Sequence, residues 1–168
     1  MKLLMAASID GYTATGPNDD MSWTSEGDKK VFRLLSNVDG PLLAGSRTWR
    51  HMPVLPGRAL LPITRNPRIV THIDATAAIG EPIETLASRY PFAWHIGGMQ
   101  SALDAMSKGF IHEIHLCRSL GVRLDIEDNF HSKYHISRFW KFFNMKPVRI
   151  MRFGPTLEVN VHWPIRGG

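Results

Sequence analysis

The stretch Leu43–Asn66 reads LAGSRTWRHMPVLPGRALLPITRN, and its pattern decides the fold class. A short apolar run ends at Gly45 and is followed by the polar, helix-like segment SRTW. A loop with the sequence LPGR leads to a second strand-like run, which ends in TRN. In an open α/β sheet, ligands bind at the carboxyl ends of strands, where a helix N-terminus offers free N–H groups to phosphate. The stretch therefore predicts an α/β sheet with a phosphate-binding turn.

This stretch resembles the core of the dihydrofolate reductase family. The family pattern is a strand, then Gly-x-x-Thr-Trp, then Leu-Pro-Gly-Arg, then a strand that ends in Thr/Ser-Arg-Asn. Ten residues match it in order and spacing: Gly45, Thr48, Trp49, Leu55, Pro56, Gly57, Arg58, Thr64, Arg65 and Asn66. The resemblance implies a three-layer α/β fold. About eight strands would form one mostly parallel sheet, with helices on both faces and a C-terminal antiparallel hairpin.

Length and composition fit this reading. At 168 residues, of which 43% are hydrophobic and 21% charged, we expect residues 1–168 to form a single domain with a substantial core. The lone Cys117 excludes an intrachain disulfide framework and fits a reducing compartment, so we expect a cytoplasmic protein. No apolar run approaches the roughly 20 residues that span a bilayer. The apolar N-terminus stops at Ser8, which is early for a signal peptide.

The formal net charge is +5, with a pI of about 9.7. This charge has two interpretations: attraction of an anionic partner, or a merely basic surface. The basic residues are scattered, with no run longer than Lys29-Lys30, which disfavours nucleic-acid binding. We therefore expect neither a nucleic-acid nor a membrane partner. A monomer or a homodimer is expected.

The N-terminal segment supports the family and also an alternative within its superfamily. Lys2–Ile9 reads as a buried strand, and SIDGYTA at its end resembles the opening of the riboflavin-pathway reductases. Thr15–Ser22 resembles the loop that closes over nicotinamide in dihydrofolate reductases. Met21-Ser22-Trp23 then matches that family's Met-Pro-Trp, with Ser in place of Pro.

A helix is expected over Glu26–Asn37, with an apolar face at Val31, Leu34, Leu35 and Val38. Asp28 and Phe32 lie four residues apart on a neighbouring face, so both can line one wall of a cleft. The resemblance makes Asp28 the acid that binds the pteridine and Phe32 the aromatic residue that packs on it. Glu26 is the rival acid, rotated about 200° around the helix. The alternative for Asp28 is a first-turn acid that favours the helix dipole.

The chemistry of a pterin explains these residue types. A carboxylate can accept two parallel N–H bonds from the 2-amino and N3 groups, and enclosure by Met5, Phe32 and Trp23 would exclude water. The implied reaction is NADPH-dependent reduction of 7,8-dihydrofolate to tetrahydrofolate, with hydride transfer to C6 and protonation at N5. Asp28 and Trp23 are the residues that the resemblance places at this chemistry, while the cofactor supplies the hydride.

A second strand–glycine–helix unit follows. We expect a strand at Arg68–His72, a loop at Asp74–Ile79, a helix at Glu81–Tyr90, a strand at Phe92–Ile96 and a helix at Gln100–Ser107. Ile-Gly-Gly at the end of the last strand resembles the family motif at which the backbone meets the nicotinamide and the pyrophosphate. The family often has a third small residue next, whereas this chain has a Met that could narrow the groove.

Phe110–Cys117 alternates as a strand. His112 and His115 point to opposite faces of such a strand, and their spacing with Glu113 does not match HExxH, so no metal site is expected. Cys117 stands where the family commonly has a Thr that supports the acid, and its thiol is a weaker donor.

The C-terminal third fits the family only in its strand pattern. His135–Met145 and Thr156–Trp163 read as two antiparallel strands, with Arg149–Pro155 as the hairpin between them. Residues 118–134 carry no readable role.

The resemblance implies two sets of binding residues. The substrate, dihydrofolate or a related pterin or pyrimidine, would meet Met5, Ala7, Asp28, Phe32, Met52, Leu55, Arg58 and Cys117. In this set Arg58 would pair with the α-carboxylate of the glutamate tail. NADPH would meet Ala7, Gly45, Ser46, Arg47, Thr48, Thr64, Arg65, Ile96, Gly97, Gly98, Met99, Gln100 and Ser101. In this set Thr64 and Arg65 would meet the 2′-phosphate, which favours NADPH over NADH.

Two alternatives stay open. The first is a reductase that acts on a ribosylamino-pyrimidine, which SIDGYTA supports. The second is a non-catalytic structural or binding member of the same fold, which the departures at Ser22, Met99 and Cys117 permit. Ser46 is a further departure, because many members have a basic residue there.

Overall fold

The computed structural model describes residues 1–16, 19, 21–24, 26–35, 40–53, 57–126 and 133–166. Leu55 and Pro56 of the LPGR loop lie outside these residues, as do Asn37 and Val38 of the expected helix.

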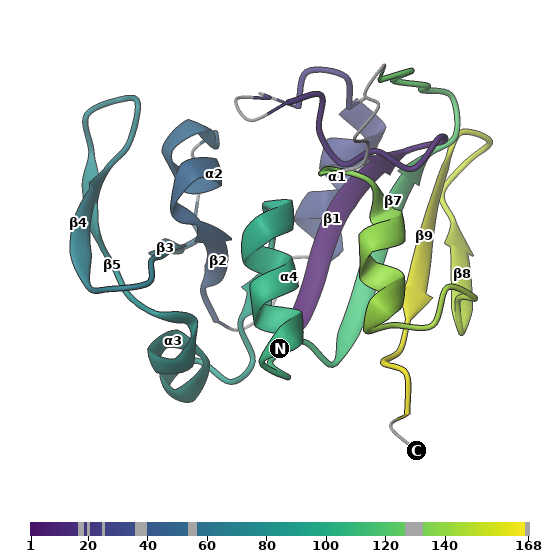
Figure 1. Ribbon diagram of the computed structural model, residues 1–168. Coiled ribbons are helices and arrows are strands. Elements are labelled where there is room, and N and C mark those ends of the chain that lie inside the picture. The colour runs from purple at the N-terminus through teal and green to yellow at the C-terminus, as the bar shows by residue number, and fades with distance from the viewer. Residues whose placement is uncertain are drawn as a thin grey trace.

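A seven-stranded sheet forms the centre of the molecule, in the order β3-β2-β6-β1-β7-β9-β8 (Figure 1). The strands from β3 to β7 pair in parallel, and β9 and β8 add to them antiparallel, which confirms the mostly parallel sheet with a C-terminal antiparallel pair. Leu3 and Leu4 are both fully buried, because the central strand β1 is covered on both faces. The strands are β1 (Lys2–Ser8), β2 (Leu42–Gly45), β3 (Leu60–Ile63), β6 (Trp94–His95), β7 (Glu113–Ser119), β8 (Arg149–Arg152) and β9 (Leu157–His162).

Helices cover both faces of this sheet, as expected. In Figure 1, α1 lies behind the sheet, and α4 and the 3-10 helix η1 lie in front of it. Two core clusters match these two layers: one packs α3, α4 and η1 against the sheet, and the other packs α1 and α2. The helices are α1 (Glu26–Leu35), α2 (Ser46–His51), α3 (Ile83–Arg89), α4 (Met99–Ser107) and η1 (Ile136–Lys141).

A separate two-stranded sheet corrects the expectation of about eight strands in one sheet. β4 (Arg68–Thr71) pairs antiparallel with β5 (Ala77–Gly80), so the expected loop at Asp74–Ile79 is wrong in its second half. Ile69 is 75% exposed. Because this hairpin buries few side chains, its sequence lacks the apolar signal of a core strand.

The expected strand at His135–Met145 is wrong, because this segment contains η1. Ile136, Phe139 and Phe143 are buried in the core at spacings of three and four residues, which is a helical period and not an alternation. The expected hairpin at Arg149–Pro155 is wrong in its first half, which is strand β8. β8 pairs only with β9 among the described strands and exposes most of its side chains, so it reads as a turn in the sequence.

The expected apolar face of α1 is also only partly correct. Val31 is buried, but Leu34 is 67% exposed. The buried face instead carries Asp28, one turn before Val31. The helix therefore turns a carboxylate toward the sheet.

Candidate active site

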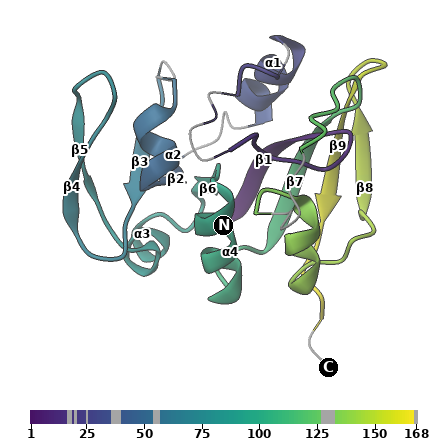
Figure 2. The same ribbon diagram turned by 45° about the horizontal axis from the view of Figure 1, so that its top comes forward.

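A cleft of about 1400 Å³ opens at the carboxyl ends of the parallel strands. Met5 and Ala6 from β1, Gly45 from β2 and Ile63 from β3 line it, together with the segment after β6 that begins at Ile96. Figure 2 turns this edge of the sheet toward the viewer. This is the edge at which open α/β sheets bind ligands, as the strand–glycine–helix pattern predicted.

An acid stands in the wall of the cleft that α1 provides. Asp28 lines the cleft and is only 5% exposed. The Ser119 hydroxyl, at the end of β7, donates a hydrogen bond to Asp28 Oδ2. A buried carboxylate needs such donors, since burial without a partner is costly. Asp28 therefore faces the cleft in a fixed orientation.

Ser119 takes the supporting role that the sequence suggested for Cys117. Cys117 lines the same cleft and is 2% exposed, and burial followed by the nearby Asp28 charge raises the pKa of its thiol to about 12. Ser119 lies two residues later on the same strand, so both side chains point to the same face of the sheet. The alternation of β7 was the signal that could have indicated Ser119.

Other expected substrate residues divide into two groups. Phe32 and Met52 line the cleft with Asp28. Arg58 does not line it and donates from Nη2 to the carbonyl oxygen of Arg33 at 2.6 Å. Leu55 lies outside the described residues.

The segment before α1 is organised by a carboxylate that sequence reasoning missed. Asp19 accepts hydrogen bonds from the backbone N–H groups of Thr15 and Met21, both at 2.7 Å, and from Trp23 Nε1 at 2.8 Å. Asp19 and Met21 line the cleft, whereas Trp23 does not. Asp and its neighbouring turn residues could have indicated such side chain-to-backbone bonds.

The two strand–glycine–helix units contact each other directly where both line the cleft. The N–H of Gly45 donates to the carbonyl oxygen of Gly97 at 2.8 Å. A Cβ atom on Gly45 would lie 2.8 Å from Ser101 Cβ, and one on Gly98 would lie 2.6 Å from Thr48 Oγ1. Neither position has room for a side chain, so these glycines are required for the close approach. The backbone of both strand–glycine–helix units therefore lies directly at the surface of the cleft.

Met99, the departure from the family pattern that could narrow the groove, lines the cleft. It begins α4, is 3% exposed and belongs to the core cluster in front of the sheet. Gln100 and Ser101 follow it in the lining of the cleft. Ala7 is fully buried in the same core cluster and does not line the cleft, whereas its neighbour Ala6 does.

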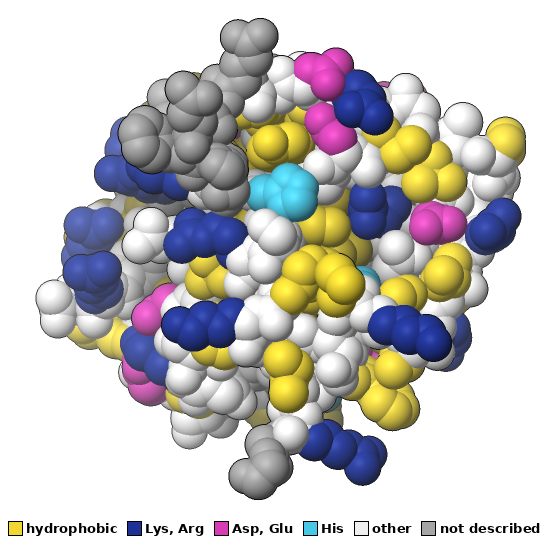
Figure 3. Space-filling view, turned by 45° about the vertical axis from the view of Figure 1, so that its right-hand side comes forward, with side chains coloured by type: hydrophobic (Ala, Val, Ile, Leu, Met, Phe, Trp, Pro, Cys, Tyr) yellow, Lys and Arg dark blue, Asp and Glu magenta, His cyan; other side chains and the backbone are white. Residues whose placement is uncertain are grey.

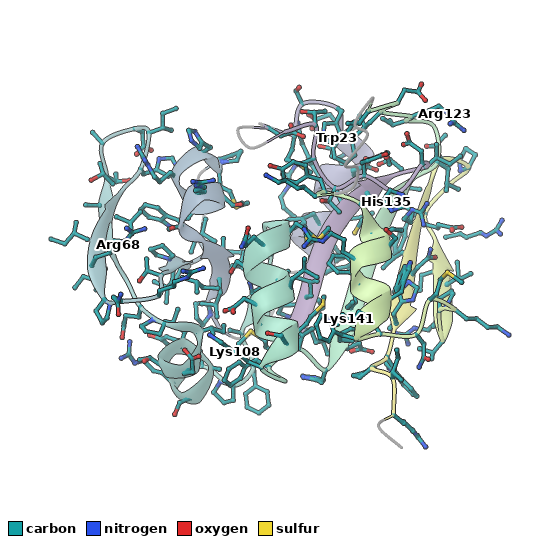
Figure 4. The ribbon with its side chains drawn as sticks, in the orientation of Figure 1. Trp23, Arg68, Lys108, Arg123, His135 and Lys141 are labelled. Atoms are coloured by element: carbon teal, nitrogen blue, oxygen red, sulfur yellow. The ribbon has the colours of Figure 1, made fainter. Side chains whose placement is uncertain are left out.

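Cationic side chains surround one part of the cleft. Arg47, Arg65 and Arg68 all line it, next to Thr64. Arg68 reaches from β4 to α2, where its Nη2 lies 3.4 Å from Ser46 Oγ (Figure 4). The guanidinium of Arg68 therefore stands beside the position at which this chain has Ser46 instead of a basic residue.

Further findings concern metal binding and membrane spanning. Among the described residues, no group of three or more His, Cys, Asp and Glu side chains could hold a metal ion. His112 Nδ1 lies 2.9 Å from the amino group of Met1. No helix in the described part of the chain has the length and apolar character that crossing a membrane requires.

Comparisons with known proteins give a match in structure alone. No family model matches the sequence, and the search among curated proteins finds no match. The structure is similar to that of the dihydrofolate reductase from Enterococcus faecalis complexed with NADP(H) and RAB-propyl, with a TM-score of 0.68. The match covers 97% of this chain and 95% of that chain, at 14% sequence identity. The chain therefore has the dihydrofolate reductase-like fold.

Proposed function

We propose that the protein is an NADPH-dependent reductase that converts 7,8-dihydrofolate to tetrahydrofolate. The observation that carries this proposal is the buried Asp28, which Ser119 orients at the wall of the large cleft. A carboxylate held in this way suits the planar pair of N–H donors on a pterin ring. Phe32, one turn later on α1, lines the cleft beside it and offers an aromatic face to the ring.

The residues of the cleft fit a nicotinamide dinucleotide. The volume of about 1400 Å³ exceeds the roughly 300–1,000 Å³ of a usual pocket for one drug-sized ligand, so the cleft has room for a cofactor beside a substrate. The contact between Gly45 and the Gly97–Gly98 turn, called the glycine junction here, lets a ligand approach the backbone closely. Arg47, Arg65 and Arg68 offer guanidinium groups to phosphates. The structure with which this fold compares holds NADP(H). Bound NADPH would supply the hydride.

The chain's own residues bind the substrate, orient its ring and help to transfer a proton to it. Asp28 accepts N–H bonds from the substrate ring and sets its orientation in the cleft. The same carboxylate is the group through which a proton, relayed by water, reaches N5. Met5 and Phe32 cover the ring and exclude bulk water, which strengthens the charge-assisted bonds to Asp28.

The test is NADPH oxidation, followed by absorbance, with dihydrofolate added to the purified protein. We expect turnover, and we expect Asp28→Asn to lower kcat by about a hundredfold or more, the typical contribution of a positioned acid. The matched control is Asp74→Asn, an exposed carboxyl change outside the cleft, which should leave kcat unchanged. Turnover that survives in Asp28→Asn would contradict the role of the acid. The absence of both turnover and NADPH binding would contradict the reductase proposal.

A second candidate is a reductase of a ribosylamino-pyrimidine. The position of Arg58 favours it, because a guanidinium outside the cleft lining is poorly placed to pair with a glutamate tail. NADPH binding without dihydrofolate turnover, together with turnover of a ribosylamino-pyrimidine, would favour this candidate.

A further inference from the structure

His95 is a fully buried polar residue to which the proposed reaction assigns no role. It is the last residue of β6, directly before Ile96-Gly97-Gly98, and none of its surface is exposed. Both of its ring nitrogens have partners: the backbone N–H of Gly97 lies 3.0 Å from Nδ1, and Ser101 Oγ lies 3.0 Å from Nε2. The ring therefore bridges the turn and the first turn of α4.

The partners decide the protonation state of this ring. A backbone N–H can only donate, so Nδ1 must accept from Gly97 and cannot carry a proton. The single ring hydrogen then lies on Nε2, which donates to Ser101 Oγ. Burial also lowers the pKa of His95, to about 4, so the ring is neutral near pH 7. An imidazolium would break the bond to Gly97, because both of its nitrogens are donors.

Gly97 is held by hydrogen bonds at both of its backbone polar groups, which belong to the two peptide units on either side of it. Gly97 donates its N–H to His95 and accepts at its carbonyl oxygen from the N–H of Gly45 at 2.8 Å. Ser101 in turn packs against Gly45, where a Cβ atom would lie 2.8 Å from Ser101 Cβ. His95 and Ser101 thus connect both glycine units of the cleft. Gly97 has a φ of +114°, a conformation that glycine adopts freely and that needs such bonds to be held.

We propose that His95, through Gly97 and Ser101, is a positioning residue that fixes the Gly97–Gly98 turn for the cofactor. This inference rests on the proposed function, because the cofactor is the ligand that the turn would contact. Every buried histidine needs hydrogen-bond partners, but those of a histidine that only filled the core could lie anywhere in the core. The two hydrogen bonds of His95 instead link its ring to the backbone of Gly97 and the side chain of Ser101, and both of these residues line the cleft.

The experiment compares three variants with the wild-type enzyme by NADPH fluorescence titration and steady-state kinetics. His95→Leu removes both bonds, Ser101→Ala removes one, and His95→Asn keeps an acceptor, Oδ1, near the position of Nδ1. We expect His95→Leu to raise the Kd and KM for NADPH by roughly tenfold or more, with KM for dihydrofolate changed by less than about twofold. His95→Asn should recover most of the lost affinity for NADPH.

His162→Asn is the matched control. His162 is also a buried histidine, 2% exposed, and its Nδ1 lies 2.8 Å from the carbonyl oxygen of Asn144, away from the cleft lining. We expect it to lower stability without a change in KM for NADPH. If His95→Leu lowers stability as His162→Asn does but keeps the wild-type Kd for NADPH, the positioning role is wrong.

A spectroscopic measurement tests the bridge without enzyme turnover. Nitrogen-15 NMR of the wild-type imidazoles should show His95 as the Nε2–H tautomer, with no titration above about pH 5. A charged ring or the Nδ1–H tautomer at pH 7 would overturn the inference even if NADPH binds. A wild-type protein that binds no NADPH would overturn the proposed function and this inference together, which distinguishes that outcome from failure of the bridge alone.

Discussion

At the scale of the residue, the candidate site depends on how Asp28 is held. The carboxylate is 5% exposed, and the Ser119 hydroxyl donates to it from the neighbouring strand. Cys117 is close enough for the Asp28 charge to raise the pKa of its thiol further, but burial is the main cause. A thiol with a pKa of about 12 stays protonated at neutral pH and is a poor nucleophile. Cys117 therefore belongs to the wall of the cleft and not to its chemistry.

Ser119→Ala tests this orientation. A hydrogen bond to a charged group contributes about 1.5–3 kcal/mol, so we expect kcat/KM for dihydrofolate to fall by roughly 10- to 100-fold. The Kd for NADPH should stay the same, because Ser119 lies at the acid and not at the glycine junction. Steady-state kinetics and fluorescence titration measure the two effects. Ser107→Ala, which removes an exposed hydroxyl from the end of α4, is the control. Unchanged kinetics in Ser119→Ala would show that Asp28 needs no support from this hydroxyl.

At the scale of the element, the small β4–β5 hairpin contributes charge to the cleft. β4 packs beside α2, and its first residue, Arg68, lies 3.4 Å from Ser46 Oγ at the start of α2. Arg68 and Arg65 line the same cleft from different elements. Through Arg68, the hairpin places a basic side chain next to Ser46. The position of Arg68 depends on the pairing of β4 with β5, which the local sequence hardly indicates.

Arg68→Ala tests whether this element selects the cofactor. If Arg68 meets the phosphate that distinguishes NADPH from NADH, the variant should raise KM for NADPH by about tenfold and leave KM for NADH unchanged. Arg123→Ala is the control, since Arg123 is exposed and pairs with Asp125 in the loop after β7, outside the cleft lining (Figure 4). An equal change in KM for both cofactors would mean that Arg68 acts on binding in general and not on the phosphate.

At the scale of the whole molecule, the basic residues are scattered along the sequence, with no run longer than Lys29-Lys30. On the face shown in Figure 3, Lys and Arg side chains stand among apolar and other side chains and form no continuous stripe. Part of the net charge of +5 comes from arginines that line the cleft, where their positive charge favours an anionic ligand. This distribution is consistent with a small anionic partner for the cleft.

Stability should depend on pH through buried histidines. Burial lowers the pKa of His95, His115 and His162 below the ordinary value of 6.5. Between the folded and unfolded pKa values, the unfolded chain binds protons that the folded protein does not, so the free energy of unfolding falls as the pH drops below about 6.5. For His95, the difference between 6.5 and about 4 corresponds to about 3 kcal/mol.

Urea unfolding at several pH values between 7.5 and 4.5 measures this effect. We expect a steady loss of stability across the range and a shallower loss in His95→Asn, which removes one of the buried histidines. A free energy of unfolding that stays constant down to pH 4.5 would contradict the burial of these neutral rings. Carboxylates such as Glu113, whose pKa is lowered despite burial because Lys2 and other partners bond to it, lose their contribution only at lower pH.

The sequence by itself determined the parts of this protein that repeat a local pattern. Largely apolar runs that end in glycine predicted β2 and β6, because strands covered on both faces have near-continuous hydrophobic sequences. The four-residue spacing of Asp28 and Phe32 predicted that both would line one wall, and the structure brings both to the cleft. The mostly parallel sheet was implied by the resemblance to the dihydrofolate reductase family, and the structure has it.

Only the tertiary structure decided which side chains from distant elements meet. Ser119, which donates a hydrogen bond to Asp28, lies 91 residues away from it in the sequence. The bridge from His95 to Gly97 and Ser101 acts where β2 and α4 pack together. The sequence predicted β4 as a strand, but η1 was misread as a strand and β5 as a loop. The buried residues of η1 follow a helical period, and β5 leaves Ala77 and Ile79 exposed. Local sequence records the period of an element, whereas contacts between elements depend on packing that no short window of sequence contains.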